Sequence, residues 1–263
     1  MPHSRLVIGF LLLIVLARIN GSGLPLVCTN QNGQQQTLQI EAEVARWAAQ
    51  LKSGNAEERR DAVIMLSQLD GDSATSALVS ALTDSLPEVR ALALGGLGAR
   101  PEQRLLPPVV ARLTSDKNPF VRKAAAYALA GFSGPERTAA LIGALRDKDQ
   151  EVRGASAVAL GEHADSTAVA PLAVALSDKS AFVRAQAARA LGVNGRAAAS
   201  AVPELVRRLA TESDPEVKRH AATALGTIGD RSALPALERA SRDSDFYLAE
   251  AARHSIRMIQ EMK

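Results

Sequence analysis

The sequence predicts an all-α protein built from about seven stacked helix pairs, and three observations support this fold class. One phrase recurs through most of the chain with a spacing of about 31 residues. Within each copy the apolar residues follow the three-to-four-residue spacing of one helix face. The chain is 47% hydrophobic but only 3% aromatic, and its abundant small apolar residues suit closely packed helices. Repeats of this kind stack into an elongated solenoid with a continuous core.

The second helix of each copy carries a reference residue near its start, which we call the anchor and which is basic in all copies but the last. The anchors are Arg59, Arg90, Arg122, Arg153, Arg184, Lys218 and, in a degenerate last copy, Ala249. Seven residues after each anchor lies an apolar residue: Leu66, Leu97, Leu129, Leu160, Leu191, Leu225 and Ile256. Four residues before it, Leu86 excepted, lies a residue that can cap a helix N-terminus: Asn55, Asn118, Asp149, Ser180, Asp214 and Asp245. Because such side chains accept a hydrogen bond from an unpaired backbone N–H, a helix is expected to begin there in each copy.

A first helix is expected before each second helix. The degenerate first copy supplies residues 38–51, and the later copies supply 73–82, 105–113, 136–145, 166–176, 199–209 and 231–240. Gly and Asp separate successive segments, as at residues 70–72 and 229–230. A helix pair of this size cannot bury its apolar face alone, so the copies must stack on one another.

The N-terminal residues are predicted to direct export of the chain rather than to form part of its fold. Residues 1–23 combine a basic start at Arg5, an apolar run at 6–17 and small residues at 21–23, which is the layout of a secretory signal peptide. A membrane span needs about 20 apolar residues, so an uncleaved membrane tether is the less favoured alternative. Residues 24–37 are predicted to be a flexible polar tether and residues 38–261 the solenoid. We therefore expect an exported protein, periplasmic or extracellular. Lipidation of Cys28 is disfavoured because Val27 precedes it.

Most copies contain an acidic residue six positions before the anchor. In the four middle copies it is Asp paired with Arg. These pairs are Asp84 and Arg90, Asp116 and Arg122, Asp147 and Arg153, and Asp178 and Arg184. Each Asp can bond backbone N–H groups and an Arg of its own or of the next copy. A structural ladder is favoured over an anion-binding arginine stripe.

The repeated phrase resembles a known family. The copies DQEVRGASAVALG and DPEVKRHAATALG resemble the HEAT-like repeat named after the phycobilisome (phycobilin) lyases, and the resemblance covers about residues 38–261. It implies a single right-handed α-solenoid of about seven helix pairs, in which the Asp–Arg ladder is structural. It says little about function, because this repeat serves many unrelated roles.

Catalysis is not expected. Deoxyhypusine hydroxylase uses the same repeat, and its His-Glu pairs hold iron. Here His220 is followed by Ala221, and the other copies lack a matching pair. One histidine cannot supply a di-iron site. A phycobilin-lyase-like role conflicts with export, and no G-x-S-x-G, P-loop or H-E-x-x-H motif occurs. We therefore predict no catalytic residue, no metal and no cofactor.

A protein partner is the favoured ligand. Without residues 1–23 the chain carries 29 basic and 28 acidic residues, which argues against nucleic acid. If the second helix lines the inner curve, positions one, two and five after the anchor should face away from the core. The partner-binding residues predicted from these positions are Leu92, Lys123, Tyr127, Val158, Gln186, Arg189, Arg219 and His220. No membrane span is expected after signal cleavage.

Aromatic residues also occur two positions before some anchors, where Glu is more usual. Phe120 and Phe182 are the clearest examples. They could form an exposed ridge along the stack or pack on neighbouring turns, and packing is the favoured interpretation.

Overall fold

The computed structural model describes residues 31–262, with side chains from residue 37 onward. The predicted signal segment 1–23 and residues 24–30 of the predicted tether lie outside the described residues. Within residues 31–262 the chain forms fourteen α-helices and no strand. The seven predicted helix pairs are therefore confirmed.

Each pair consists of an odd-numbered first helix and an even-numbered second helix. The first helices are α1 (Gln31–Gln50), α3 (Asp72–Ala81), α5 (Leu106–Ser115), α7 (Pro135–Ala144), α9 (Val169–Ala175), α11 (Val202–Thr211) and α13 (Leu234–Ala240). The second helices are α2 (Ala56–Gln68), α4 (Pro87–Gly98), α6 (Pro119–Ala128), α8 (Gln150–Leu160), α10 (Ala181–Val193), α12 (Pro215–Ile228) and α14 (Phe246–Glu261). Short 3₁₀ turns join several of them: η1 (Gln103–Leu105), η2 (Leu129–Gly131), η3 (Ser166–Ala168), η4 (Gly195–Ala201) and η5 (Arg231–Ala233).

The second helices begin where the capping pattern predicts. The Asn118 side chain, for example, accepts a hydrogen bond of 2.8 Å from the backbone N–H of Phe120. Leu86 cannot cap, and α4 instead begins with Pro87, which has no N–H to satisfy. The carboxylate of Asp84 accepts the backbone N–H of Leu86 at 2.8 Å. The same bond occurs in copies that have a capping side chain, as from the Asn118 N–H to Asp116 at 3.0 Å, so the ladder acid orders the turn before the helix with or without a cap.

The first helix corrects one predicted boundary. Residues 31–37 were expected to belong to a flexible tether, but α1 begins at Gln31 and includes them. Glutamine is a good helix former, so a polar run such as residues 34–36 can extend a helix. Polar composition alone does not distinguish a helical extension from a flexible tether.

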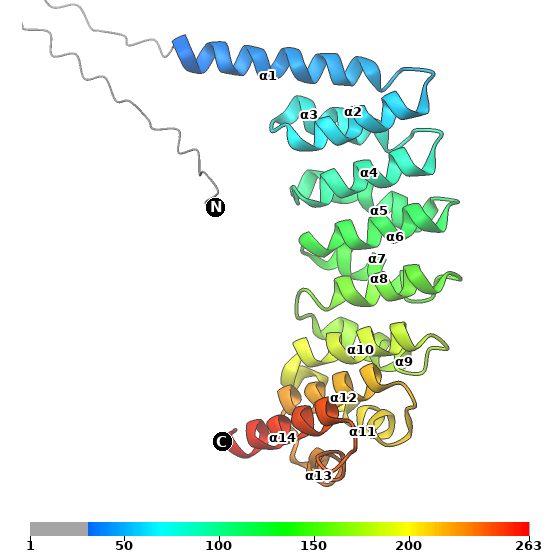
Figure 1. The fold of residues 1–263 in the computed structure, drawn as a ribbon, viewed down its shortest axis with the longest axis vertical. Helices are drawn as coiled ribbons and strands as arrows, with labels where there is room; N and C mark the ends of the chain where they lie inside the picture. The colour runs from blue at the N-terminus through cyan, green and yellow to red at the C-terminus, as the bar shows by residue number, and fades with distance from the viewer. Residues whose placement is uncertain (1–30, 263) are drawn as a thin grey trace, which may run out of the picture.

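The stack is curved, and the second helices line its inner side. Figure 1 shows the pairs stacked along the long axis, with α4, α6, α8 and α10 in the nearer row and α5, α7 and α9 behind them. Neighbouring second helices contact one another more extensively than neighbouring first helices do. The more tightly packed row must have the shorter arc, so the second helices form the inner curve.

Leucines and small residues build the core between copies. The apolar residue seven positions after the anchor is fully buried in six copies, whereas Ile256 of the last described copy is only half-buried. Glycines eight positions after the anchor allow close approach of second helices. A Cβ at Gly98 would lie 2.7 Å from the Cα of Ala128, and one at Gly226 would lie 2.8 Å from the Cα of Ser255. The Ala-Leu-Gly ending of the repeat therefore sets the spacing of the inner row.

Candidate functional site

The acid–base ladder joins each copy to the next. Arg90 binds Asp116 of the following copy through two hydrogen bonds of 2.8 Å, from Nε and Nη2. Its third donor, Nη1, bonds the backbone carbonyl of Asp84 in its own copy at 2.8 Å. Each guanidinium therefore binds the carboxylate of the next copy and the main chain of its own copy. This arrangement decides between the two partners that the sequence left open.

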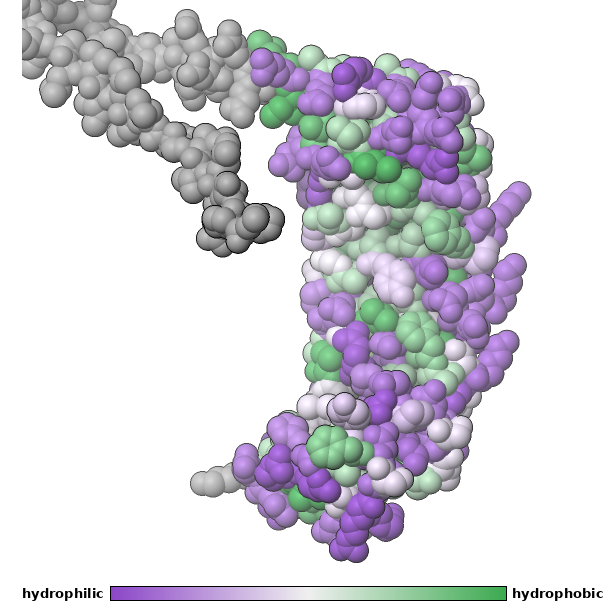
Figure 2. Space-filling view, viewed as in Figure 1, coloured by the Kyte–Doolittle hydropathy of each residue, from purple (hydrophilic) through white to green (hydrophobic). Residues whose placement is uncertain are grey.

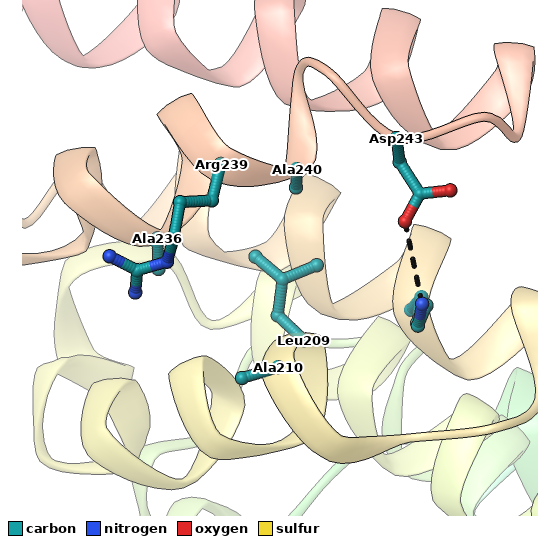
Figure 3. A pocket seen from close by; sticks show the side chains of 7 residues that line it. Leu209, Ala210, Ala236, Arg239, Ala240 and Asp243 are labelled. Carbon is teal, nitrogen blue, oxygen red and sulfur yellow. Dashed lines mark hydrogen bonds and ion pairs between the residues drawn. The ribbon is translucent and has the colours of Figure 1, made fainter.

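The same geometry repeats along the stack. The remaining rungs are Arg59 with Asp84, Arg122 with Asp147, Arg153 with Asp178, Arg184 with Glu212, and Lys218 with Asp243. The last rung is the weakest, because a lysine makes a single contact of 3.5 Å. Figure 3 shows Asp243 of this rung beside a cavity of about 220 Å³ between α11 and α13. The ladder thus spans all seven copies and weakens at the C-terminal end.

Four ladder acids, Asp116, Asp147, Asp178 and Glu212, have a pKa below its usual value. Burial acts to raise the pKa of Asp147, but hydrogen bonds from Arg122 and from the Asp149 N–H outweigh it and keep the pKa below its usual value. Asp116 and Asp178 behave in the same way. The Arg184 guanidinium lowers the pKa of Glu212 to about 2, although burial opposes it. Because each rung is already neutralised by its partner, the ladder holds the copies together and leaves no free arginine stripe for an anion.

Hydrophobic side chains are exposed on the inner face. Figure 2 shows apolar surface, in green, gathered along the middle of the stack. Tyr127 is 44% exposed and Leu92 is 38% exposed, while Val158, on the next second helix α8, is half-buried. Exposed aromatic side chains are typical anchors of protein interfaces. Leu92 and Tyr127 are therefore exposed, as their positions in the repeat predict, whereas Val158 is only partly exposed.

The polar candidates on this face are already engaged within the chain. Lys123 lies 3.9 Å from Glu151 and 5.7 Å from the Phe120 ring. Arg189 bonds Glu162, the side chain of Gln186 and the carbonyl of Val158, each at 3.2 Å. A partner would have to replace these contacts, so Lys123, Gln186 and Arg189 are weaker anchors than the exposed apolar residues.

Arg219 and His220 belong to one cluster at the start of α12. Arg219 forms ion pairs with Glu216 and, at 2.9 Å, with Asp245, and it lies 5.9 Å from the Tyr247 ring. His220 is 3.9 Å from Glu216. Burial lowers the pKa of His220, and the Glu216 carboxylate opposes this effect. The cluster fixes the contact between the last two copies.

The expectation for one row of surface positions is wrong in three of the copies. Position one after the anchor was expected to face away from the core, but Ala91, Gly154 and Ala185 are buried, and so is Ala155 at position two. In these copies the next second helix lies close enough on the inner curve to cover this side of the helix. A Cβ on Gly154 would lie 2.2 Å from the Phe182 ring of the next copy.

One residue of the aromatic row contributes to this burial. Phe182 packs over Gly154, although 39% of its surface stays exposed. Here a large residue two positions before the anchor Arg184 meets a small residue one position after the anchor Arg153. In two other copies the residue one position after the anchor is a long cation. Lys123 then contacts Glu151 of the next copy, and Arg219 contacts the Tyr247 ring of the next copy. This size complementarity is present in the sequence, but it is recognised only when the residues two positions before each anchor are compared with those one position after the preceding anchor.

Neither a metal cluster nor a membrane span emerges from the described part of the chain. Among the described side chains, no three His, Cys, Asp or Glu residues lie close enough together to hold a metal ion. None of the described helices has the length and apolar character to cross a membrane.

The comparisons with known proteins identify the repeat. The sequence profile of HEAT repeats matches residues 44–130, 75–160, 138–199 and 175–257, which together cover most of the chain. The chain therefore belongs to the HEAT-repeat family. Among curated protein sequences, none matches it significantly.

Solved structures share the same fold. The YibA protein of Escherichia coli is 22% identical, with a TM-score of 0.66 over 90% of each chain. An engineered protein is 26% identical, with a TM-score of 0.57 over 82% of this chain and 68% of its own. The CpcE–CpcF complex of phycocyanin lyase from Nostoc is 20% identical, with a TM-score of 0.53 over 94% of this chain and 98% of its own. These similarities show the fold. Any activity has to be inferred from the residues of this chain.

Proposed function

We propose that this protein is a non-catalytic scaffold that binds a protein partner on the inner face of its solenoid. The exposed Tyr127 and Leu92 on neighbouring second helices carry the proposal. A solenoid keeps its core fixed while its surface positions vary, which suits partner binding. The ladder charges are satisfied within the chain, so the exposed apolar residues are the best anchors that this face offers.

The inner face is tested with matched surface variants. The partner is first captured by pull-down from the exported fraction, and its affinity for purified Tyr127→Ala is then measured. Truncation of an anchor residue typically costs on the order of 2 kcal/mol, so affinity should fall about 30-fold. Val174→Ala is the control, because Val174 is 76% exposed on the first helix α9, away from the inner row. Equal affinities of both variants would refute the inner face as the binding surface.

Arg189→Ala gives a second test of the same surface. Because Arg189 already bonds Glu162 and Gln186, its removal should weaken binding less than Tyr127→Ala does. A loss at Arg189 that exceeds the loss at Tyr127 would show that recognition is electrostatic rather than apolar.

The proposed absence of catalysis has its own discriminating measurement. A HEAT-repeat oxidoreductase of the deoxyhypusine hydroxylase type would carry iron, and His220 is the one residue here that matches its histidine ligands. Elemental analysis of the purified protein should find no stoichiometric metal. Stoichiometric iron that is lost in His220→Ala would overturn the scaffold proposal in favour of an enzyme.

Export is proposed on the layout of residues 1–23, in which a basic start precedes an apolar run of twelve residues. Cell fractionation with N-terminal sequencing tests it, and a cleaved chain outside the cytosol is expected. A chain that begins at Met1 in the cytosolic fraction would contradict export.

A further inference from the structure

The fourth copy contains a cavity that the scaffold function does not use. It has a volume of about 660 Å³ and lies between the start of α7 and the segment 163–167 that follows α8. Its polar lining includes Arg137, Thr138, His163, Asp165 and Thr167. Several lining residues are exposed, so the cavity opens to solvent, while Arg137 and Thr138 lie at its buried side.

Arg137 occupies a core position that is apolar in the other regular copies. It lies sixteen residues before its anchor, and it is only 1% exposed. The equivalent residues are Ala74, Leu106, Ala168, Val202 and Ala233, all of them buried, and Glu43 in the degenerate first copy. Because an arginine is costly to bury, and five copies fold without one here, the fold itself does not require Arg137.

The guanidinium of Arg137 is held without a carboxylate partner. Nε donates to the carbonyl of Leu129 at 2.9 Å, and Nη2 donates to the carbonyl of Ala159. Both carbonyls lie at the C-terminal ends of second helices, where the helix dipole favours a cation. Among the described residues, Nη1 donates to no protein atom and no Asp or Glu forms an ion pair with Arg137. A buried cation with a spare donor therefore lines the cavity.

Asp165 places a negative charge in the wall of the same cavity. Its carboxylate accepts hydrogen bonds from the backbone N–H of Thr167 at 3.0 Å and from the Thr167 hydroxyl at 2.6 Å. These hydrogen bonds keep the pKa of Asp165 below its usual value, so it is ionised at neutral pH. The cavity thus combines one buried cation, one anion and several hydroxyl groups.

We propose that this cavity binds a small carboxylate that carries a hydrogen-bond donor beside its carboxyl group, as α-amino and α-hydroxy acids do. Arg137 pairs with the ligand carboxylate through a charge-assisted hydrogen bond. Asp165 accepts the neighbouring amino or hydroxyl group. A dianion such as phosphate fits less well, because the Asp165 charge repels it. A pocket that surrounds a few convergent polar groups in this way is typical of small-molecule sites. The inference does not depend on the proposed protein partner.

Isothermal titration of the purified full chain with glycine, L-alanine and L-lactate tests the site. We expect binding to the wild-type protein and at least a tenfold loss in Arg137→Leu. This variant should keep or raise the melting temperature, since Leu106 fills the same position in the preceding copy. Arg104→Leu is the control, because Arg104 is exposed and outside the cavity lining, and its binding should equal that of the wild type.

A second variant separates the two charges of the site. Asp165→Asn keeps a capping side chain, and it should weaken glycine binding more than acetate binding. The proposal is overturned if no probe binds the wild type in the millimolar range, or if Arg137→Leu binds as the wild type does. Tighter binding of inorganic phosphate than of every carboxylate would overturn the assigned ligand class. A large fall in melting temperature for Arg137→Leu, with no ligand bound by the wild type, would show that Arg137 is structural.

Discussion

The spacing of the inner row can be tested with two glycines of the same helix. Gly95 and Gly98 both lie in α4. A Cβ at Gly95 would meet no atom within 4 Å, whereas one at Gly98 would lie 2.7 Å from the Cα of Ala128 and 3.0 Å from its Cβ. The two substitutions to Ala therefore change the helix in a similar way but differ in what the new methyl group contacts.

The expected magnitudes follow from this geometry. Gly95→Ala should raise the free energy of unfolding by about 1 kcal/mol, the difference in helix propensity. Gly98→Ala brings carbon atoms about 1 Å closer than their optimal separation, so α4 and α6 must move apart. Overpacking of this kind costs about 1–3 kcal/mol, which should outweigh the propensity gain.

Chemical and thermal unfolding, followed by circular dichroism, measure the difference between the two variants. At this chain length 1 kcal/mol shifts the melting temperature by roughly 2–4 °C, so the variants should separate by several degrees. Gly95→Ala should melt above the wild type and Gly98→Ala below it. If Gly98→Ala were as stable as Gly95→Ala, close approach of the second helices would not be what the repeat glycine provides.

Two further predictions concern the ladder. Arg122→Met leaves Asp147 without its partner at a largely buried site and should lower the free energy of unfolding in urea by about 3 kcal/mol. Arg60→Met removes an exposed pair with Glu57 and should cost under about 1 kcal/mol, so similar losses in both variants would contradict a special role for the ladder. The second prediction is acid sensitivity at Glu212, whose pKa falls from 4.5 to about 2 on folding. The lowered pKa stabilises the folded state above pH 4.5, and this contribution of about 3 kcal/mol should be lost as the pH falls from 4.5 towards 2. Unfolding measured across this pH range should show a smaller decline in Glu212→Gln, and an unchanged decline would assign acid sensitivity to other groups.

Much of the fold followed from sequence because its determinants are local. The apolar spacing, the cap residues and the anchors recur within each copy, so seven helix pairs and most of their starting points could be predicted. The length of α1 could not, since the polar residues 31–37 are compatible with both a tether and a helix. The inner-face residues were predicted from helix periodicity alone, which explains why Tyr127 and Leu92 are exposed as expected while Ala91 and Gly154 are not.

The sequence by itself determined the repeat, the helix pairing and the identity of the ladder groups, because these depend on contacts that each copy makes with its own residues or with an identical neighbour. Only the tertiary structure decided which acid each arginine binds, since that choice depends on the distance between successive second helices. It also decided that position one after the anchor is covered in three copies, because curvature brings the second helices together on the inner side. Arg137 shows the same limit. Its sequence position marks it as unusual, but only the packed structure reveals a buried cation, without an acid partner, beside a cavity.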